Sequence, residues 1–159
     1  MDIIFFPWGI LMILFTFAGM EGVAWFTHKY IMHGWFWFLH KDHHVKTPPD
    51  DSIIERNDSF FLVFAFPSML LFALWQWKDL SWALYVALGI ALYGLAYFII
   101  HDVFIHQRLK FLKRSNHPYL KAIRKAHKIH HKHLTKFNGE CFGMLLVPFK
   151  YIREMKRNA

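Results

Sequence analysis

The chain of 159 residues contains a single cysteine, Cys141. One cysteine allows no internal disulfide and no cysteine-rich zinc or iron–sulfur site. Any metal that the protein holds must therefore be bound by imidazole or carboxylate ligands. Twelve histidines are available for that purpose, together with eleven aspartates and glutamates.

Charged residues are also scarce, at 19% of the chain, whereas hydrophobic residues make up 55% and aromatic residues 19%. This apolar content exceeds that of an ordinary soluble domain of similar size. Three apolar stretches, at about 3–26, 60–77 and 81–100, approach the roughly 20 residues that a helix needs to cross a bilayer. We expect an all-α, integral membrane helical bundle with about three to four membrane helices, forming one domain over residues 1–159.

A fourth apolar run, at residues 141–149, is too short to span a membrane and contains Pro148. We expect it to be re-entrant, interfacial, or packed beneath the bundle.

Acidic residues are scarcest after residue 100, where 14 lysines and arginines stand against three carboxylates. Two expected crossings separate residue 40 from residue 110, so the regions around them share one side of the membrane. The positive-inside rule assigns that side to the cytoplasm of a multi-pass protein, in a bacterial inner membrane. A long basic helical region is expected at about 107–137. We expect this region to contact membrane lipid headgroups or an acidic electron carrier, and not nucleic acid.

Ten of the twelve histidines form four motifs on the shared side, and the two kinds of motif repeat in the same order. HxxxxH occurs at His28 and His33, then at His101 and His106; HxxHH occurs at His40, His43 and His44, then at His127, His130 and His131. His117 and His133 fall outside the patterns. Ten nitrogen ligands exceed what one ion can use, so the motifs predict a dinuclear metal site in a cytoplasmic helical cap.

The two spacings differ in what they predict. On a helix, the three histidines of HxxHH lie on one face, within reach of a common ion. The histidines of HxxxxH would lie roughly 140° apart on a regular α-helix. We therefore expect a helix end, a π-bulge, or two rings that serve a central cluster from different angles.

Imidazole suits iron, copper, zinc and nickel alike, so ligand type does not identify the metal. A redox-active metal beside a bilayer fits oxygen chemistry on an apolar substrate, which favours iron, although histidine sites also take up zinc or nickel during expression. Three carboxylates lie close to the motifs: Glu21, Asp42 and Asp102. Each is a candidate acceptor for the second ring nitrogen of a ligating histidine. The alternative role for Glu21 is a side chain that merely extends to the membrane interface.

The order of the motifs resembles that of the fatty-acid-hydroxylase superfamily of integral-membrane di-iron enzymes. The surrounding words GMEGVAWFTHKYIMHGW, YGLAYFIIHDVFIHQR and AHKIHH resemble the bacterial beta-carotene 3-hydroxylases within it. The resemblance extends from Gly19 to about Pro148. It implies that the ten motif histidines bind two ferrous ions, with no catalytic residue beyond these ligands. It also implies a monooxygenase that uses dioxygen, and electrons from a ferredoxin and its reductase. The implied reaction is hydroxylation at carbon 3 of the beta-ionone rings of beta-carotene, through beta-cryptoxanthin to zeaxanthin.

The sequence is also compatible with other functions. A related superfamily enzyme would act on a fatty acyl chain, a sterol or another carotenoid. A metal transporter or storage protein would need polar residues through the membrane interior, and stretches 60–77 and 81–100 have almost none. A haem electron carrier would place histidines on opposing helices within the bilayer, whereas these histidines gather at helix ends.

Overall fold

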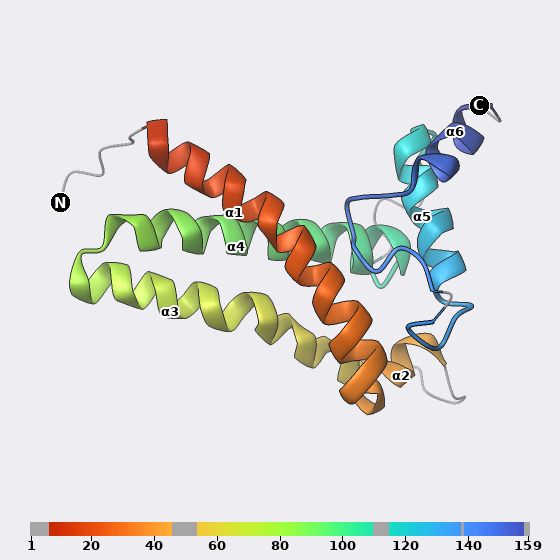
Figure 1. Cartoon of the computed structure of the whole chain (residues 1–159), viewed down its shortest axis with the longest axis horizontal. Helices are drawn as coiled ribbons and strands as arrows, with labels where there is room; N and C mark the ends of the chain where they lie inside the picture. The colour runs from red at the N-terminus through yellow and green to blue at the C-terminus, as the bar shows by residue number, and fades with distance from the viewer. Residues whose placement is uncertain (1–6, 46–53, 110–114, 138, 158–159) are drawn as a thin grey trace. The chain divides into compact units, whose positions relative to one another are not determined.

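The computed structural model describes residues 7–45, 54–109, 115–137 and 139–157. Its regular elements are helical, with no strand among these described residues, which confirms the expected all-α class. Figure 1 shows the elements, which in chain order are α1 Pro7–Phe26, η1 Thr27–Trp35, α2 Trp37–His44, η2 Arg56–Phe61, α3 Leu62–Lys78, α4 Ser81–Phe98, η3 Ile99–Ile105, α5 Pro118–His130 and α6 Phe149–Arg157.

Three helical stretches have the length and apolar composition to cross a membrane: Pro7–Trp35, Arg56–Lys78 and Ser81–Ile105. They coincide with the three predicted spans and extend beyond them. The first and third gain π-helical turns at their C-terminal ends, and the second gains a 3-10 turn at its start. Residues 3–6 of the first predicted span lie outside the described residues.

The chain divides into two compact units, each built from separate stretches of sequence. The first contains Met1–Met20 and Phe60–Ala96, and the second contains Glu21–Ser59 and Tyr97–Ala159. Helices α1 and α4 each begin in the first unit and continue into the second. The single domain expected over residues 1–159 stays a prediction.

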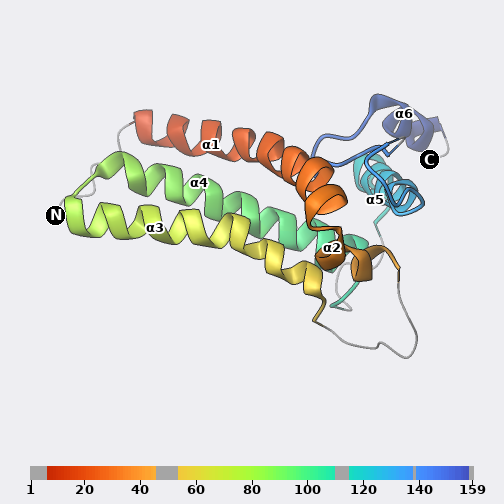
Figure 2. The same cartoon turned by 60° about the horizontal axis from the view of Figure 1, so that its bottom comes forward.

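In the first unit, α3 and α4 form an antiparallel hairpin beside the first part of α1 (Figure 2). The Ser68 hydroxyl on α3 donates a 3.0 Å hydrogen bond to the Ala87 carbonyl on α4. Helix α1 approaches α4 at Gly89, where a Cβ atom would lie 2.6 Å from the Cβ of Thr16. Only a residue without a side chain permits this close approach, which is typical of helix pairs in membranes.

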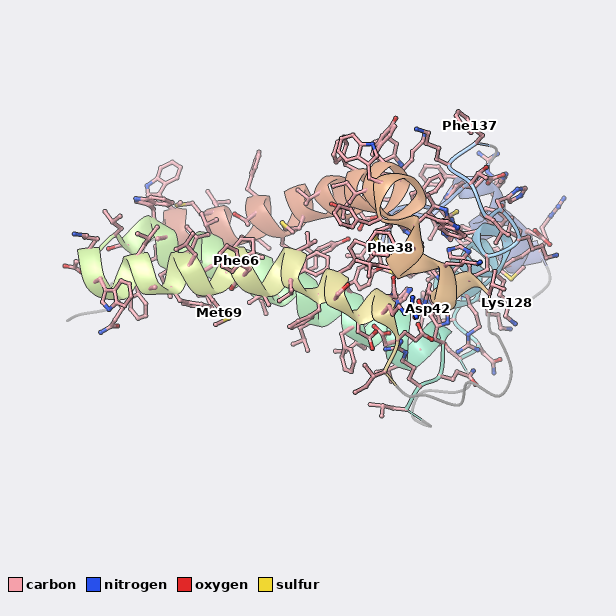
Figure 3. The ribbon with its side chains drawn as sticks, turned by 90° about the horizontal axis from the view of Figure 1, so that it is seen from below. Phe38, Asp42, Phe66, Met69, Lys128 and Phe137 are labelled. Carbon is pink, nitrogen blue, oxygen red and sulfur yellow. The ribbon has the colours of Figure 1, made fainter. Side chains whose placement is uncertain are left out.

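The outer face of α3 is apolar. Phe66 and Met69 are both exposed and project from this helix (Figure 3). A large apolar surface of this kind is unfavourable in water and suits contact with lipid chains.

The second unit is built around α5, which packs against α6. The inward face of α5 carries Ala122, Ile123 and Ala126, and Ile123 joins a buried cluster with Phe104 and Met144. The helix begins at Pro118, where the missing amide hydrogen costs nothing because the first-turn amides have no helical partner. The predicted helical region 107–137 was therefore too long, since the described residues on either side of α5 are irregular. Residues 110–114 lie outside the described residues.

The fourth apolar run lies within this second unit. Residues 139–147 form an irregular segment, and α6 begins directly after Pro148. The segment packs through Met144 into the buried cluster, and the Leu145 carbonyl accepts a 2.6 Å hydrogen bond from the Tyr119 hydroxyl. We refer to residues 139–147 as the connecting segment.

Candidate metal centre

Both HxxxxH motifs lie in π-helical turns. The amide of His106 donates to the carbonyl of His101, five residues earlier, at 2.9 Å. In η1 the amide of Phe36 donates to the carbonyl of Ile31 at 2.8 Å, across a kink at Gly34, whose backbone is not helical. This widened turn brings residues five apart onto one side of the helix. The ring centroids of His28 and His33 are 5.1 Å apart, and those of His101 and His106 are 4.6 Å apart. Of the three arrangements considered from the sequence, the structure contains the π-bulge.

The motif histidines gather into two groups whose ligand atoms lie within 4.8 Å of one another. We call them group A, which contains His28, His33, His40, His44 and His130, and group B, which contains His43, His101, His106 and His127. All lie in the second compact unit.

Each HxxHH motif is split between the two groups. His40 and His44, four residues apart on α2, belong to group A, whereas His43 belongs to group B. On α5 the arrangement is reversed, because His127 belongs to group B and His130 to group A. The expectation that one motif serves a common ion is therefore wrong. Histidines close together on one helix therefore belong to different groups. Each group contains histidines from both α2 and α5.

The tenth histidine, His131, lies beside group B. Its Nε2 atom is 2.8 Å from Nε2 of His127, and its ring stacks on that of His44 at 4.3 Å between centroids. On α2, Nε2 of His44 is 3.0 Å from Nε2 of His40. His131, directly after α5, thus lies against His127 as His44 lies against His40 on α2.

Hydrogen bonds at the outer nitrogens determine which ring nitrogens face the group A centre. The Nδ1–H groups of His28 and His130 donate to the carbonyls of Phe142 and Glu140, each at 2.9 Å, and His33 Nδ1–H donates to Leu134 at 3.2 Å. A carbonyl only accepts, so each neutral ring carries its hydrogen on Nδ1 and leaves Nε2 as a lone pair.

These lone pairs converge. The Nε2 atoms of His33 and His130 are 3.1 Å apart, as are those of His28 and His40. In the neutral His33–His130 pair no hydrogen lies between the two nitrogens, so their lone pairs repel. Two ligands at about 2.1 Å from one ion, at right angles, would be roughly 3.0 Å apart. The group A residues therefore fit a bound cation.

Burial keeps these imidazoles neutral. Desolvation, reinforced by the neighbouring histidines, lowers the pKa of His40, His44 and His130 to about 2. The same causes lower the pKa of His43 and His127 well below the ordinary value. Neutral, unprotonated nitrogens at physiological pH are the form that binds metal ions.

Carboxylates support group B. The His43 Nδ1–H donates to Glu55 at 2.9 Å, and Glu55 also pairs with Arg108 at 2.8 Å. Asp102 lies 3.2 Å from the same arginine and 3.4 Å from Nδ1 of His101, which forms no hydrogen bond among the described residues. Within the described part of the chain, the inward Nε2 of His43 is buried and has no hydrogen-bond partner. An atom of this kind fits metal ligation.

Sequence reasoning missed two of these supporting side chains, Glu55 and Asn57. The Asn57 amide oxygen accepts a 2.6 Å hydrogen bond from Nδ1–H of His40, and Asn57 is buried. Both residues lie in the polar stretch of sequence 46–58, which has no helical periodicity. The one available signal was the presence of an asparagine and a glutamate shortly after a histidine motif.

The three carboxylates singled out from the sequence occupy different settings. Asp102 lies beside a motif histidine, as described above. Asp42 accepts a 2.7 Å hydrogen bond from the amide of Arg56, and so holds the backbone between Glu55 and Asn57. Glu21 is buried, and its carboxylate accepts hydrogen bonds from backbone amides of the connecting segment. These contacts match neither predicted role of Glu21, as an acceptor for a ligating histidine or as a side chain that extends to the membrane interface.

Comparisons with known proteins agree with this arrangement. The family model described as fatty acid hydroxylase matches residues 13–151. The chain is 40% identical to a beta-carotene hydroxylase of Pantoea ananas, over 89% of this chain and 78% of that protein. It is 36% identical to a beta-carotene hydroxylase of Paracoccus sp. (strain PC1), over 93% of this chain and 91% of that protein. No solved structure matches it significantly. The chain belongs to the fatty acid hydroxylase family.

Proposed function

We propose that this protein is a non-haem di-iron monooxygenase that hydroxylates carbon 3 of the beta-ionone rings of beta-carotene, giving zeaxanthin through beta-cryptoxanthin. The observation that carries the proposal is the convergence of neutral histidine nitrogens on two centres. The names of the relatives supply the substrate, since both the Pantoea and the Paracoccus proteins are called beta-carotene hydroxylases.

Two iron ions are the proposed cofactors. Group A would hold one ion, and group B together with His131 would hold the other. Bound iron supplies the activation of dioxygen that insertion into an unactivated C–H bond requires. The surrounding residues keep the ligands neutral and oriented. The ring of Phe142 lies against His28, His33 and His130, with centroids 5.6, 5.4 and 5.0 Å away, and excludes water from that side of group A.

The reducing electrons are proposed to come from a ferredoxin and its reductase. Helix α5 presents its ligand histidines inward, while Lys128 and Lys132 are exposed (Lys128 in Figure 3). A helix is about 10–12 Å across, so an acidic carrier docked on these lysines would lie close to the metals.

The protein has three helices of membrane-spanning length, and we propose a multi-pass bacterial inner-membrane location with the histidines on the cytoplasmic side. The lysine and arginine surplus after residue 100 supports this side. The same basic residues would contact anionic membrane lipids.

Expression in bacteria that accumulate beta-carotene tests the activity, with pigments identified by chromatography and His130→Ala as the control. Zeaxanthin is expected from the parent chain and not from the variant. If beta-carotene persists while the parent is membrane-inserted, iron-loaded and supplied with a ferredoxin system, the carotenoid assignment is wrong.

The family match favours one second candidate, a hydroxylase of fatty acyl chains or sterols with the same metal chemistry. Lipid extracts from the same cells, analysed by mass spectrometry for hydroxylated acyl chains and sterols, would reveal it.

A further inference from the structure

Glu21 is a buried carboxylate on α1, with 6% of its surface exposed. It accepts hydrogen bonds from three consecutive amides of the connecting segment: Met144 at 2.9 Å, Leu145 at 2.9 Å and Leu146 at 2.8 Å. A carboxylate that accepts several backbone hydrogen bonds holds that backbone strongly, because charge-assisted hydrogen bonds are about twice as strong as neutral ones.

The backbone of the connecting segment approaches Glu21 closely at Gly143. A Cβ atom on Gly143 would lie 2.5 Å from the Glu21 carboxylate oxygen. Glycine at this position therefore lets the backbone close around the carboxylate, and any side chain there would push the two apart.

The same segment orients two ligands of group A. Its Phe142 carbonyl accepts from His28, and its Glu140 carbonyl accepts from His130. These two hydrogen bonds fix the tautomers that direct Nε2 toward the centre. Glu21 and His28 lie seven residues apart, two turns of one helical stretch, and they contact the segment at adjacent points.

We propose that Glu21 is a positioning residue for the group A metal site. It acts through the connecting segment: the carboxylate fixes residues 143–146, which hold the Phe142 and Glu140 carbonyls against His28 and His130. The inference rests on the proposed function only in requiring that group A and group B each bind a metal. It requires no particular substrate.

Purified protein loaded with Fe²⁺ and challenged with a ferrous chelator tests the role. Glu21→Gln keeps the shape but removes the charge, and its amide N–H₂ replaces Oε2, which accepts from Leu145 at 3.0 Å. We expect one iron per chain to leave about 10–100-fold faster than in the parent, as for other residues that orient ligands, while the second leaves at the parent rate. Gly143→Ala should have the same effect from the other side of the contact.

Glu154→Gln is the matched control, since it removes a carboxylate from an ion pair with Lys125 in the same unit. It should leave both release rates unchanged. Thermal unfolding and size-exclusion chromatography identify variants that do not fold. If Glu21→Gln is one of them, the iron-release rates of Gly143→Ala decide the inference.

Three outcomes would overturn the inference: folded Glu21→Gln and Gly143→Ala that both release iron as the parent does, equal acceleration of both irons, or a parent that binds fewer than two. A parent that binds two irons but produces no zeaxanthin would contradict the proposed function alone. The release rates would still decide the role of Glu21.

Discussion

At the scale of single residues, the two histidine groups differ in what holds their outer nitrogens. Backbone carbonyls and the Asn57 amide oxygen accept from histidines of group A, whereas the Glu55 carboxylate accepts from His43 in group B. A carboxylate acceptor increases the electron-donating strength of an imidazole more than a neutral acceptor does. The two metals should therefore have different ligand fields.

Replacing Glu55 with glutamine should weaken iron binding at group B. The change removes the charge that faces both His43 and Arg108, and outer partners of metal ligands typically contribute about 10–100-fold to affinity. Iron stoichiometry under a chelator measures the loss. Asp58→Asn is the control, because Asp58 also pairs with Arg108, at 2.7 Å, and accepts from the Glu55 backbone amide rather than from a histidine. Equal losses in the two variants would attribute the effect to Arg108.

Asn57→Leu should lower both the iron content of group A and the free energy of unfolding. The leucine side chain branches at the same atom but leaves Nδ1 of buried His40 without its 2.6 Å partner. An unsatisfied buried donor costs about 1–3 kcal/mol. Denaturant unfolding of the metal-free protein measures this loss, and iron content measures the effect on the site. Unchanged stability would show that His40 finds another acceptor.

These residues also show how far a sequence can predict the site. The ten histidines were evident because their spacing repeats. Asn57 and the connecting-segment carbonyls were not, because the contact between His28 and Phe142 joins positions 114 residues apart. Such a contact depends on tertiary packing and leaves no local pattern.

At the scale of elements, local periodicity predicted helices well and their detailed geometry less well. A five-residue spacing of histidines suggested a π-bulge among other arrangements, and η1 and η3 contain it. The division of each HxxHH motif between two centres was not predicted, because α2 and α5 must both be in place before adjacent histidines can reach different ions.

The exposed lysines at the end of α5 and directly after it give a prediction about electron transfer. Lys128→Glu combined with Lys132→Glu should reduce turnover driven by a ferredoxin at least several-fold at low salt, because both exposed charges would repel an acidic carrier. The deficit should shrink as ionic strength rises and screening weakens the repulsion. Turnover assays across a salt series measure both effects.

Two controls accompany this variant. Turnover with a chemical reductant should be unchanged, and Lys78→Glu, at the end of α3, should behave as the parent does. A loss of activity with the chemical reductant as well would mean that the substitutions damage α5 and its ligands, and that the lysines are not the docking surface.

At the scale of the whole molecule, charge predicts orientation in the membrane. The turn between α3 and α4 carries Lys78 and Asp79, with exposed Trp77 and Trp82 close by, whereas the basic residues concentrate after residue 100. Tryptophan rings favour the bilayer interface, and lysines and arginines favour the cytoplasmic side. Hydropathy identified the three spans because a helix that crosses a bilayer must be apolar over a fixed length. The grouping of α1 with α3 and α4 depends on contacts such as Gly89 with Thr16, which no periodicity reveals.

Reporter fusions should therefore place the turn of the α3–α4 hairpin and the C-terminal region of the chain on opposite sides of the membrane. Green fluorescent protein fused after Ala159 should fluoresce, because it folds in the cytoplasm, whereas alkaline phosphatase inserted after Lys78 should be active, because it requires the periplasm. Exchanging the two reporters should abolish both signals. The opposite pattern would place the histidines outside, where a cytoplasmic ferredoxin could not reach them. Both the orientation and the proposed electron donor would then be wrong, while the two metal-binding groups would stand.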